Sequence, residues 1–142
     1  MTLLQSLDVD VMGLDLHPPY EQRSDISRGD ITGPCVGIGQ YFDLVICREV
    51  LEHLTVSAIS RAVTNLCWYS SRFVYGTTRL HDREDILSVD THDQLDPTHI
   101  SIVSKKFLRL LFILHGFTYR SELALLMDHR ALGRTFVFER TS

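Results

Sequence analysis

The sequence contains, at residues 42–54, the segment FDLVICREVLEHL, in which an apolar run ends in a charged turn. Residues 41–47 are almost continuously apolar, which is typical of a strand covered on both faces of a parallel sheet. Charged or titratable side chains follow this strand at once: Arg48, Glu49, Glu52 and His53. Because ligands of open α/β sheets bind outside the carboxyl ends of the strands, we expect the functional site at this turn.

The elements on either side of this segment are expected to alternate between strand and helix. Upstream, residues 2–7 fit the end of a helix, residues 9–15 form a short β-rich run, and residues 29–31 fit a second short strand. Downstream, apolar residues recur at helical spacing after Thr55, a suitable N-cap. Residues 72–78 then have the pattern of the next strand.

The C-terminal part of the chain is expected to end the sheet with reversed strands. Residues 79–103 are a long polar segment, and a loop of this length in a compact domain usually has a function. Ser104 is the predicted N-cap of a helix that Gly116 ends. The runs 119–127 and 134–140 are predicted to pair as an antiparallel hairpin. The pattern therefore predicts an α/β fold, mainly parallel with a C-terminal antiparallel hairpin.

The bulk composition is that of an ordinary globular protein. Residues 1–142 fit one domain, with 44% hydrophobic and 23% charged residues. A formal net charge of -4 argues against a general nucleic-acid-binding protein, which carries a basic excess. Three cysteines without CxxC spacing argue against a disulfide framework, and no apolar run reaches the roughly 20 residues that span a bilayer. Because residues 1–5 do not resemble a signal peptide, we expect a soluble, cytoplasmic protein without a membrane partner.

Two acids follow the upstream strands, where a carboxylate can bind a ribose. Asp15 ends the first run, and Asp30 belongs to the second. A carboxylate has two acceptor oxygens and can accept hydrogen bonds from both vicinal hydroxyls. Judged by its position alone, Asp15 is more often a turn residue, because Asp is common in turns. Spacing therefore leaves both interpretations open.

These segments together resemble the motifs of class I S-adenosylmethionine-dependent methyltransferases. VMGLDL, residues 11–16, is similar to the motif whose acid binds the cofactor ribose, and residues 29–31 resemble the motif beside the adenine. FDLVICREVLEHL resembles the fourth strand and its turn, and residues 96–117 resemble the segment around the last crossover helix. The resemblance implies a Rossmann-like sheet, methyl transfer, and S-adenosylmethionine as the cofactor. The cofactor-binding residues that it implies are Asp15, Leu16, Asp30, Ile31, Cys47 and Arg48.

The Gly-rich first motif of that family has no counterpart in this sequence. It is expected upstream of Leu3, and the sequence begins inside what resembles the helix that follows it. Residues 37–39, Gly-Ile-Gly, are no substitute, because they precede a strand instead of following one. A domain truncated in this way lacks a central strand, so we expect weak or no cofactor binding by this chain alone. We also expect an exposed sheet edge through which two copies could form a homodimer.

The turn after the central strand and the polar segment supply the catalytic candidates. His53 would face the reactive end of the cofactor, and histidine titrates near neutral pH, which suits a base. It fits equally well as a helix-start histidine that hydrogen-bonds the backbone. Glu49 would lie nearer the cofactor than Glu52, whose other role is favourable charge at a helix N-terminus. His99, within the segment Asp-Pro-Thr-His, is the candidate for contact with the methyl acceptor.

Residues 81–99 contain three histidines and five aspartates. Both residue types are suitable metal ligands, but their spacing here is irregular and matches no metal-binding motif. The favoured interpretation is a solvated acidic loop that closes over the substrate. We therefore assign no metal ligand from the sequence.

The hypothesis that follows is methyl transfer to a small-molecule or saccharide-like acceptor. The first alternative is a non-catalytic remnant that acts as a binding or assembly module. The second is a metal-dependent hydrolase that uses the His/Asp-rich segment. Titration with S-adenosylmethionine separates the hypothesis from the first alternative, and metal analysis tests the second.

Overall fold

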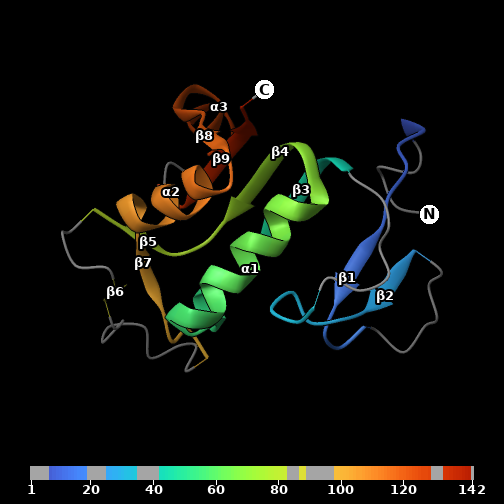
Figure 1. The fold of residues 1–142 in the computed structure, drawn as a ribbon, viewed down its shortest axis with the longest axis horizontal. Helices are drawn as coiled ribbons and strands as arrows, with labels where there is room; N and C mark the ends of the chain where they lie inside the picture. The colour runs from blue at the N-terminus through green and yellow to red at the C-terminus, as the bar shows by residue number, and fades with distance from the viewer. Residues whose placement is uncertain are drawn as a thin grey trace.

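A computed structural model describes residues 7–18, 25–34, 42–82, 87–88, 98–128 and 133–141 (Figure 1). Its elements in chain order are β1 (Gly13–Asp15), β2 (Ile26–Arg28), β3 (Phe42–Arg48), the 3-10 helix η2 (Leu51–His53), α1 (Val56–Tyr69), β4 (Ser70–Thr77), β5 (Leu80–His81), β6 (Leu87–Ser88), β7 (Ile102–Ser104), α2 (Lys105–Leu114), β8 (Phe117–Tyr119), α3 (Ser121–Met127) and β9 (Thr135–Arg140). The helix end predicted at residues 2–7 and the segment 37–39 lie almost entirely outside the described residues.

The central unit of β3, α1 and β4 has the parallel arrangement that the sequence predicts. β3 and β4 are parallel neighbours, with Cys47 opposite Gly76. Thr55 caps α1, because its side chain accepts a hydrogen bond from the N–H of Ala58. The carboxyl ends of the two strands lie side by side, where the N–H of Glu49 donates to the Thr77 carbonyl at 2.9 Å.

The C-terminal antiparallel pair is confirmed, but its first strand lies earlier than predicted. The strand β8 ends at Tyr119, and residues 121–127 form the helix α3. The sequence SELALLM lacks β-branched residues and consists mainly of strong helix formers, which explains the helix. β9 is antiparallel to both β4 and β8, so the strand order of this sheet is β3-β4-β9-β8.

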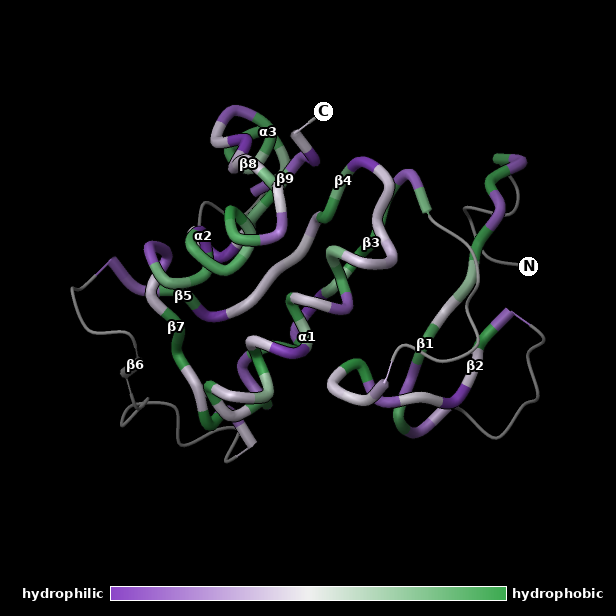
Figure 2. Tube along the Cα trace, viewed as in Figure 1, coloured by the Kyte–Doolittle hydropathy of each residue, from purple (hydrophilic) through white to green (hydrophobic). Residues whose placement is uncertain are grey.

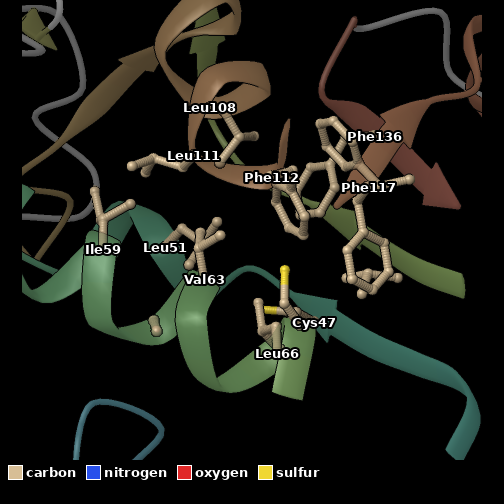
Figure 3. Packing of buried hydrophobic residues seen from close by; sticks show 14 of the residues in the cluster. Cys47, Leu51, Ile59, Val63, Leu66, Leu108, Leu111, Phe112, Phe117 and Phe136 are labelled. Carbon is tan, nitrogen blue, oxygen red and sulfur yellow. The ribbon is translucent and has the colours of Figure 1, made fainter. Parts of the chain in front are cut away.

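The helices α1 and α2 pack together on one face of this sheet and enclose the hydrophobic core (Figure 3). Successive side chains of a strand alternate between faces, and Cys47, Val74 and Phe138 point into this core. The Phe112 ring of α2 stacks on Phe138, with 4.0 Å between the ring centroids. Ser104 caps α2 as predicted, by accepting a hydrogen bond from the N–H of Phe107.

The other face of β3 is uncovered in the part of the chain that the structure describes. Leu44 and Ile46, which alternate with the core-facing residues, are 47% and 49% exposed. At the far side of the sheet α3 packs on β9, where Val137 is buried. Figure 2 colours each residue by its hydropathy, and the hydrophobic residues include both buried and exposed ones. The prediction that this strand is covered on both faces is wrong for the described residues.

A separate pair of short strands, β1 and β2, lies to one side of α1 (Figure 1). The two strands are parallel, with Asp15 opposite Arg28. The second strand ends at Arg28, so the prediction of a strand at 29–31 is wrong by three residues. Gly29 and Asp30 instead begin the turn after β2, because the Asp30 side chain accepts the N–H of Thr32 and bends the chain.

The polar segment 79–103 contains short strands, contrary to the expectation of one long loop. β5 and β6 both pair with β7, so three short strands form a small second sheet with the order β5-β7-β6. Most of residues 83–97 lie outside the described residues. In the described part of the chain, no helix is long and apolar enough to cross a membrane.

Candidate functional site

The first part of the candidate site is formed by the carboxyl ends of β1 and β2. Asp15 Oδ1 accepts a hydrogen bond from the N–H of His17 at 2.7 Å, so Asp15 forms the turn after β1. Asp30 Oδ1 accepts from both the N–H and the hydroxyl of Thr32, each at 2.8 Å. The N–H of Gly29 donates to the Asp15 carbonyl at 3.0 Å, which joins the two turns. The turns that contain Asp15 and Asp30 therefore adjoin each other.

The residues beside these two acids differ in what they contact. Leu16 is about half exposed, whereas Ile31 packs against the hydrophobic core. The N–H and the hydroxyl of Thr32 lower the pKa of Asp30, and the Arg61 guanidinium lowers it further. Asp30 is therefore a carboxylate at neutral pH, as an acceptor of hydroxyl hydrogen bonds has to be.

The turn after β2 is held against α1 by the side chain of Asn65. Its Nδ2 donates to the carbonyl of Ile31 at 2.6 Å and to that of Gly33 at 2.8 Å. Asn65 and Arg61 both belong to α1, the helix that begins just after the turn of β3. The acids of β1 and β2 and the turn after β3 are thus connected through one helix. Sequence reasoning missed Asn65; a polar residue on the apolar face of a predicted helix was the available signal.

The turn after β3 divides its residues between the core and the solvent. The Cys47 side chain is buried in the core, and burial, assisted by the charge of Glu52, raises the pKa of its thiol to about 12. Arg48 and Glu49 are exposed. Glu49 has a φ of 52°, in the left-handed region that a residue with a Cβ rarely adopts. Residues with strained backbone angles are common at ligand-binding sites, so the conformation of Glu49 favours a binding role for this turn.

Glu49 and Glu52 have opposite electrostatic environments. The Thr77 hydroxyl beside Glu49 lowers the pKa of that carboxyl, and its interaction with the Glu52 carboxyl lowers it further, with smaller contributions from Arg134 and Arg48. Burial raises the pKa of Glu52, and the neighbouring Glu49 carboxylate raises it further. Two nearby carboxyl groups with pKa values shifted apart are a common feature of functional sites.

Glu52 lies in the short helix η2 and is completely buried, with 0% of its surface exposed. Its Oε2 accepts a hydrogen bond from the Thr78 hydroxyl at 2.9 Å. Its main-chain carbonyl accepts from the N–H groups of Ile100 and Ser101. Glu52 lies in the first turn of a helix, as the sequence interpretation allows, but its burial was not foreseen. The residue joins the β3 turn to the segment that begins at Thr98.

The same contact brings His53 and His99 together, although they are far apart in the sequence. Their ring centroids are 4.7 Å apart, and the planes are tilted by 57°. His53 Nδ1 lies 2.9 Å from the hydroxyl of Thr98 and 3.2 Å from its carbonyl oxygen. The three predicted catalytic residues, Glu49, His53 and His99, therefore belong to one turn and the segment bonded to it. Thr98 was missed as a partner, although it stands beside His99 in the Asp-Pro-Thr-His segment.

A hollow of about 520 Å³ lies elsewhere, at the start of β4. The residues that line it are Thr64, Cys67, Trp68, Ser70, Ser71, His115 and Arg140. Ser70 begins β4, whereas Thr77, beside Glu49, ends it. The hollow thus lies at the amino end of β4, whereas the candidate site lies at its carboxyl end. None of the predicted site residues lines the hollow.

Comparison with known proteins gives matches among solved structures only. No protein-family model matches the chain, and no curated protein sequence matches it significantly. The magnesium protoporphyrin IX methyltransferase ChlM from Synechocystis PCC 6803, solved with bound S-adenosylmethionine, has a TM-score of 0.55 and 15% identity. That match covers 86% of this chain and 48% of the enzyme, so the chain spans about half the enzyme's length.

Two further structures extend the likeness. The 1,6-didemethyltoxoflavin-N1-methyltransferase from Burkholderia thailandensis has a TM-score of 0.65 at 12% identity, over 97% of this chain and 64% of the enzyme. The cyclase SpnF has a TM-score of 0.53 at 14% identity, over 82% of this chain and 56% of its own. Because identities this low establish the fold alone, these matches are evidence of architecture. The chain shares the Rossmann-like α/β fold of these solved structures.

Proposed function

We propose that the chain is part of an enzyme that binds S-adenosylmethionine and transfers its methyl group to a small-molecule or saccharide-like acceptor. The observation that supports this most is the arrangement of acids at the strand ends. Asp15 and Asp30 lie in adjoining turns, and Asn65 and Arg61 connect these turns to the helix that follows Glu49. Ligands of parallel α/β sheets bind outside these strand ends.

The nucleoside of the cofactor fits the acids of β1 and β2. Each turn uses one oxygen of its aspartate, and a carboxylate has a second oxygen that can accept from a ribose hydroxyl. Leu16, exposed beside Asp15, and Ile31, half-buried beside Asp30, supply apolar surface for the adenine. Since the Cys47 thiol is in the core, we assign its contribution to the main chain, next to the exposed Arg48.

The acceptor side of the proposed site consists of Glu49, His53 and His99. When bound, S-adenosylmethionine supplies an activated methyl group, so the protein's main task is to orient the acceptor. Glu49 is ionised and exposed, and His53 is held by Thr98. Either side chain can orient a hydroxyl acceptor, and His53 has the chemistry to accept its proton.

The test is a titration of the folded chain with S-adenosylmethionine, followed by NMR of the backbone amides. We expect weak but saturable shifts at millimolar cofactor, confined to the turns at Asp15, Asp30 and Glu49. Asp15→Ala should weaken binding by about 1–3 kcal/mol, the usual cost of leaving polar partners unpaired. Asp43→Ala is the matched control, because Asp43 lies near the amino end of β3, away from the site.

An absence of shifts at millimolar cofactor, in chain whose NMR spectrum is that of a folded protein, would contradict this proposal. That outcome would favour the non-catalytic binding or assembly module. The match to SpnF, which is described as a cyclase, shows why the test is needed, since one fold supports several activities.

A second copy of the chain is the partner that we propose for the edge of the sheet. Among the described strands β3 is at an edge of its sheet, and Leu44 and Ile46 are about half exposed on its uncovered face. Edge strands with apolar side chains promote pairing with another chain. Sedimentation equilibrium should show a dimer that Leu44→Lys dissociates, whereas Leu110→Lys, on the exposed side of α2, should leave it intact. A monomer at all concentrations would contradict the dimer.

A further inference from the structure

A cluster of one carboxylate and two imidazoles lies beside the proposed acceptor site. One ligand atom from each of Glu52, His53 and His99 lies within 4.8 Å of the other two. Two of these residues belong to η2, and the third is brought to them by the hydrogen bonds from Ile100 and Ser101 to the Glu52 carbonyl. Because these residues are irregularly spaced in the sequence, the sequence alone does not predict the cluster.

The environment of the Glu52 carboxyl group is the observation that indicates a bound ligand. Glu52 is completely buried, and the Thr78 hydroxyl satisfies only its Oε2. Within the described residues, its Oε1 has no hydrogen-bond partner. A buried carboxylate oxygen without a partner is costly, and such groups in folded proteins usually coordinate a metal or bind water or an ion.

The two histidines have the features of metal ligands. His53 Nδ1 is held by the carbonyl and hydroxyl of Thr98, which fixes the orientation of its ring. Metal-ligating histidines usually have such a partner at the nitrogen that does not bind the ion. Ligand atoms about 2.1 Å from a zinc ion are roughly 3.4 Å apart in a tetrahedron, so the three side chains would have to approach by roughly 1 Å.

We propose that Glu52, His53 and His99 bind a divalent transition-metal ion of the zinc type. Two imidazoles and one carboxylate are the donor set of open zinc sites, in which a fourth position is left for water or a substrate oxygen. Glu49 adds a second negative charge close to Glu52, partly offset by Arg48 and Arg134. The open position would face the acceptor, so the ion selects an acceptor that offers an oxygen ligand.

This inference deepens the proposed function, because it rests on the same acceptor side of the site. With the ion bound, His53 is a ligand and not a base, since Thr98 holds Nδ1 and the ion would take Nε2. It can nevertheless fail separately, since the ion is measured without cofactor or acceptor. A chain that binds zinc but not S-adenosylmethionine would retain the metal site and lose the methyltransferase proposal. The reverse result would remove the metal site alone.

The experiment is a calorimetric titration of the chelator-treated, folded chain with Zn²⁺, and a parallel titration with Co²⁺ followed by its visible absorption. We expect one ion per chain and the absorption of a four-coordinate Co²⁺ site. His53→Ala and His99→Ala should each weaken binding at least tenfold. Glu52→Gln should do the same, and it retains an oxygen that can accept from Thr78.

His115→Ala is the matched control, because His115 contacts Thr64 of α1 and is not in the cluster. Its affinity for Zn²⁺ should equal that of the unchanged chain. Three outcomes would overturn the proposal: no binding by the folded chain, unchanged binding in all three cluster variants, or equal loss in the control. Circular dichroism of each variant separates loss of a ligand from loss of the fold.

Discussion

Proposed site residues lie in two described regions of this molecule, of which one has a hydrophobic core and the other has none. The packed region is residues 42–82, 98–128 and 133–141, and it encloses a core of buried aliphatic and aromatic side chains between α1, α2 and the four-stranded sheet. The β1–β2 unit, residues 13–15 and 25–34, contributes no buried residue. Its strands are three residues long, and Leu14 is exposed.

The two regions hold their proposed site residues in place by different interactions. Asp15 and Asp30 are placed by local turns, which need few residues. Glu52, His53 and His99 are placed by contacts between distant segments within the packed region. We therefore expect the β1–β2 unit to open independently of the packed region, because it has few buried apolar contacts.

The largest effect is expected from a methyl group added at Gly76. A Cβ there would lie 2.3 Å from the Cys47 carbonyl oxygen and 2.4 Å from the Phe136 ring, within the packed region. Gly76→Ala should lower the free energy of unfolding by about 1–3 kcal/mol, since overpacking forces the backbone to shift. Urea denaturation followed by circular dichroism measures the change.

The matched control is Gly13→Ala in the β1–β2 unit. There the closest atom to an added Cβ is a side-chain carbon of Ile26 at 3.2 Å, which can move aside. We expect a much smaller loss of stability than at Gly76. Equal losses at both positions would mean that the two regions unfold as one unit, and the comparison would fail.

A smaller effect is expected at the connection between the two regions. Asn65→Ala removes the hydrogen bonds to the carbonyls of Ile31 and Gly33, each worth about 1 kcal/mol. Amide hydrogen exchange should become faster in residues 29–34 and stay slow in β3 and β4. Ser60→Ala, on the exposed side of α1, should change neither. Faster exchange throughout the chain would show that Asn65 stabilises the packed region instead.

The smallest effect is expected from a thiol reagent at pH 8. Burial raises the pKa of Cys47 and of Cys67 to about 12, so both thiols are protonated at this pH and are shielded from the reagent. In a Cys35→Ser variant the folded chain should not react with a disulfide reagent, and both thiols should react in urea. Rapid reaction of the folded chain would show that the packed region opens as readily as the β1–β2 unit.

The sequence was informative wherever a local pattern is sufficient. The apolar run of β3 and the caps at Thr55 and Ser104 predict their elements because the signals lie within a few residues. The helix α3 was mistaken for a strand, since the apolar run 119–127 fits either element and its contacts with β9 lie outside it.

The sequence by itself thus determined the order and type of most elements, because hydrogen bonding within a helix or turn depends on neighbouring residues. Only the tertiary structure decided that Glu52 is buried, that Asn65 binds the β2 turn, and that Leu44 is left exposed. Burial and long-range hydrogen bonds depend on which distant segments meet. The composition of any one segment does not contain that information.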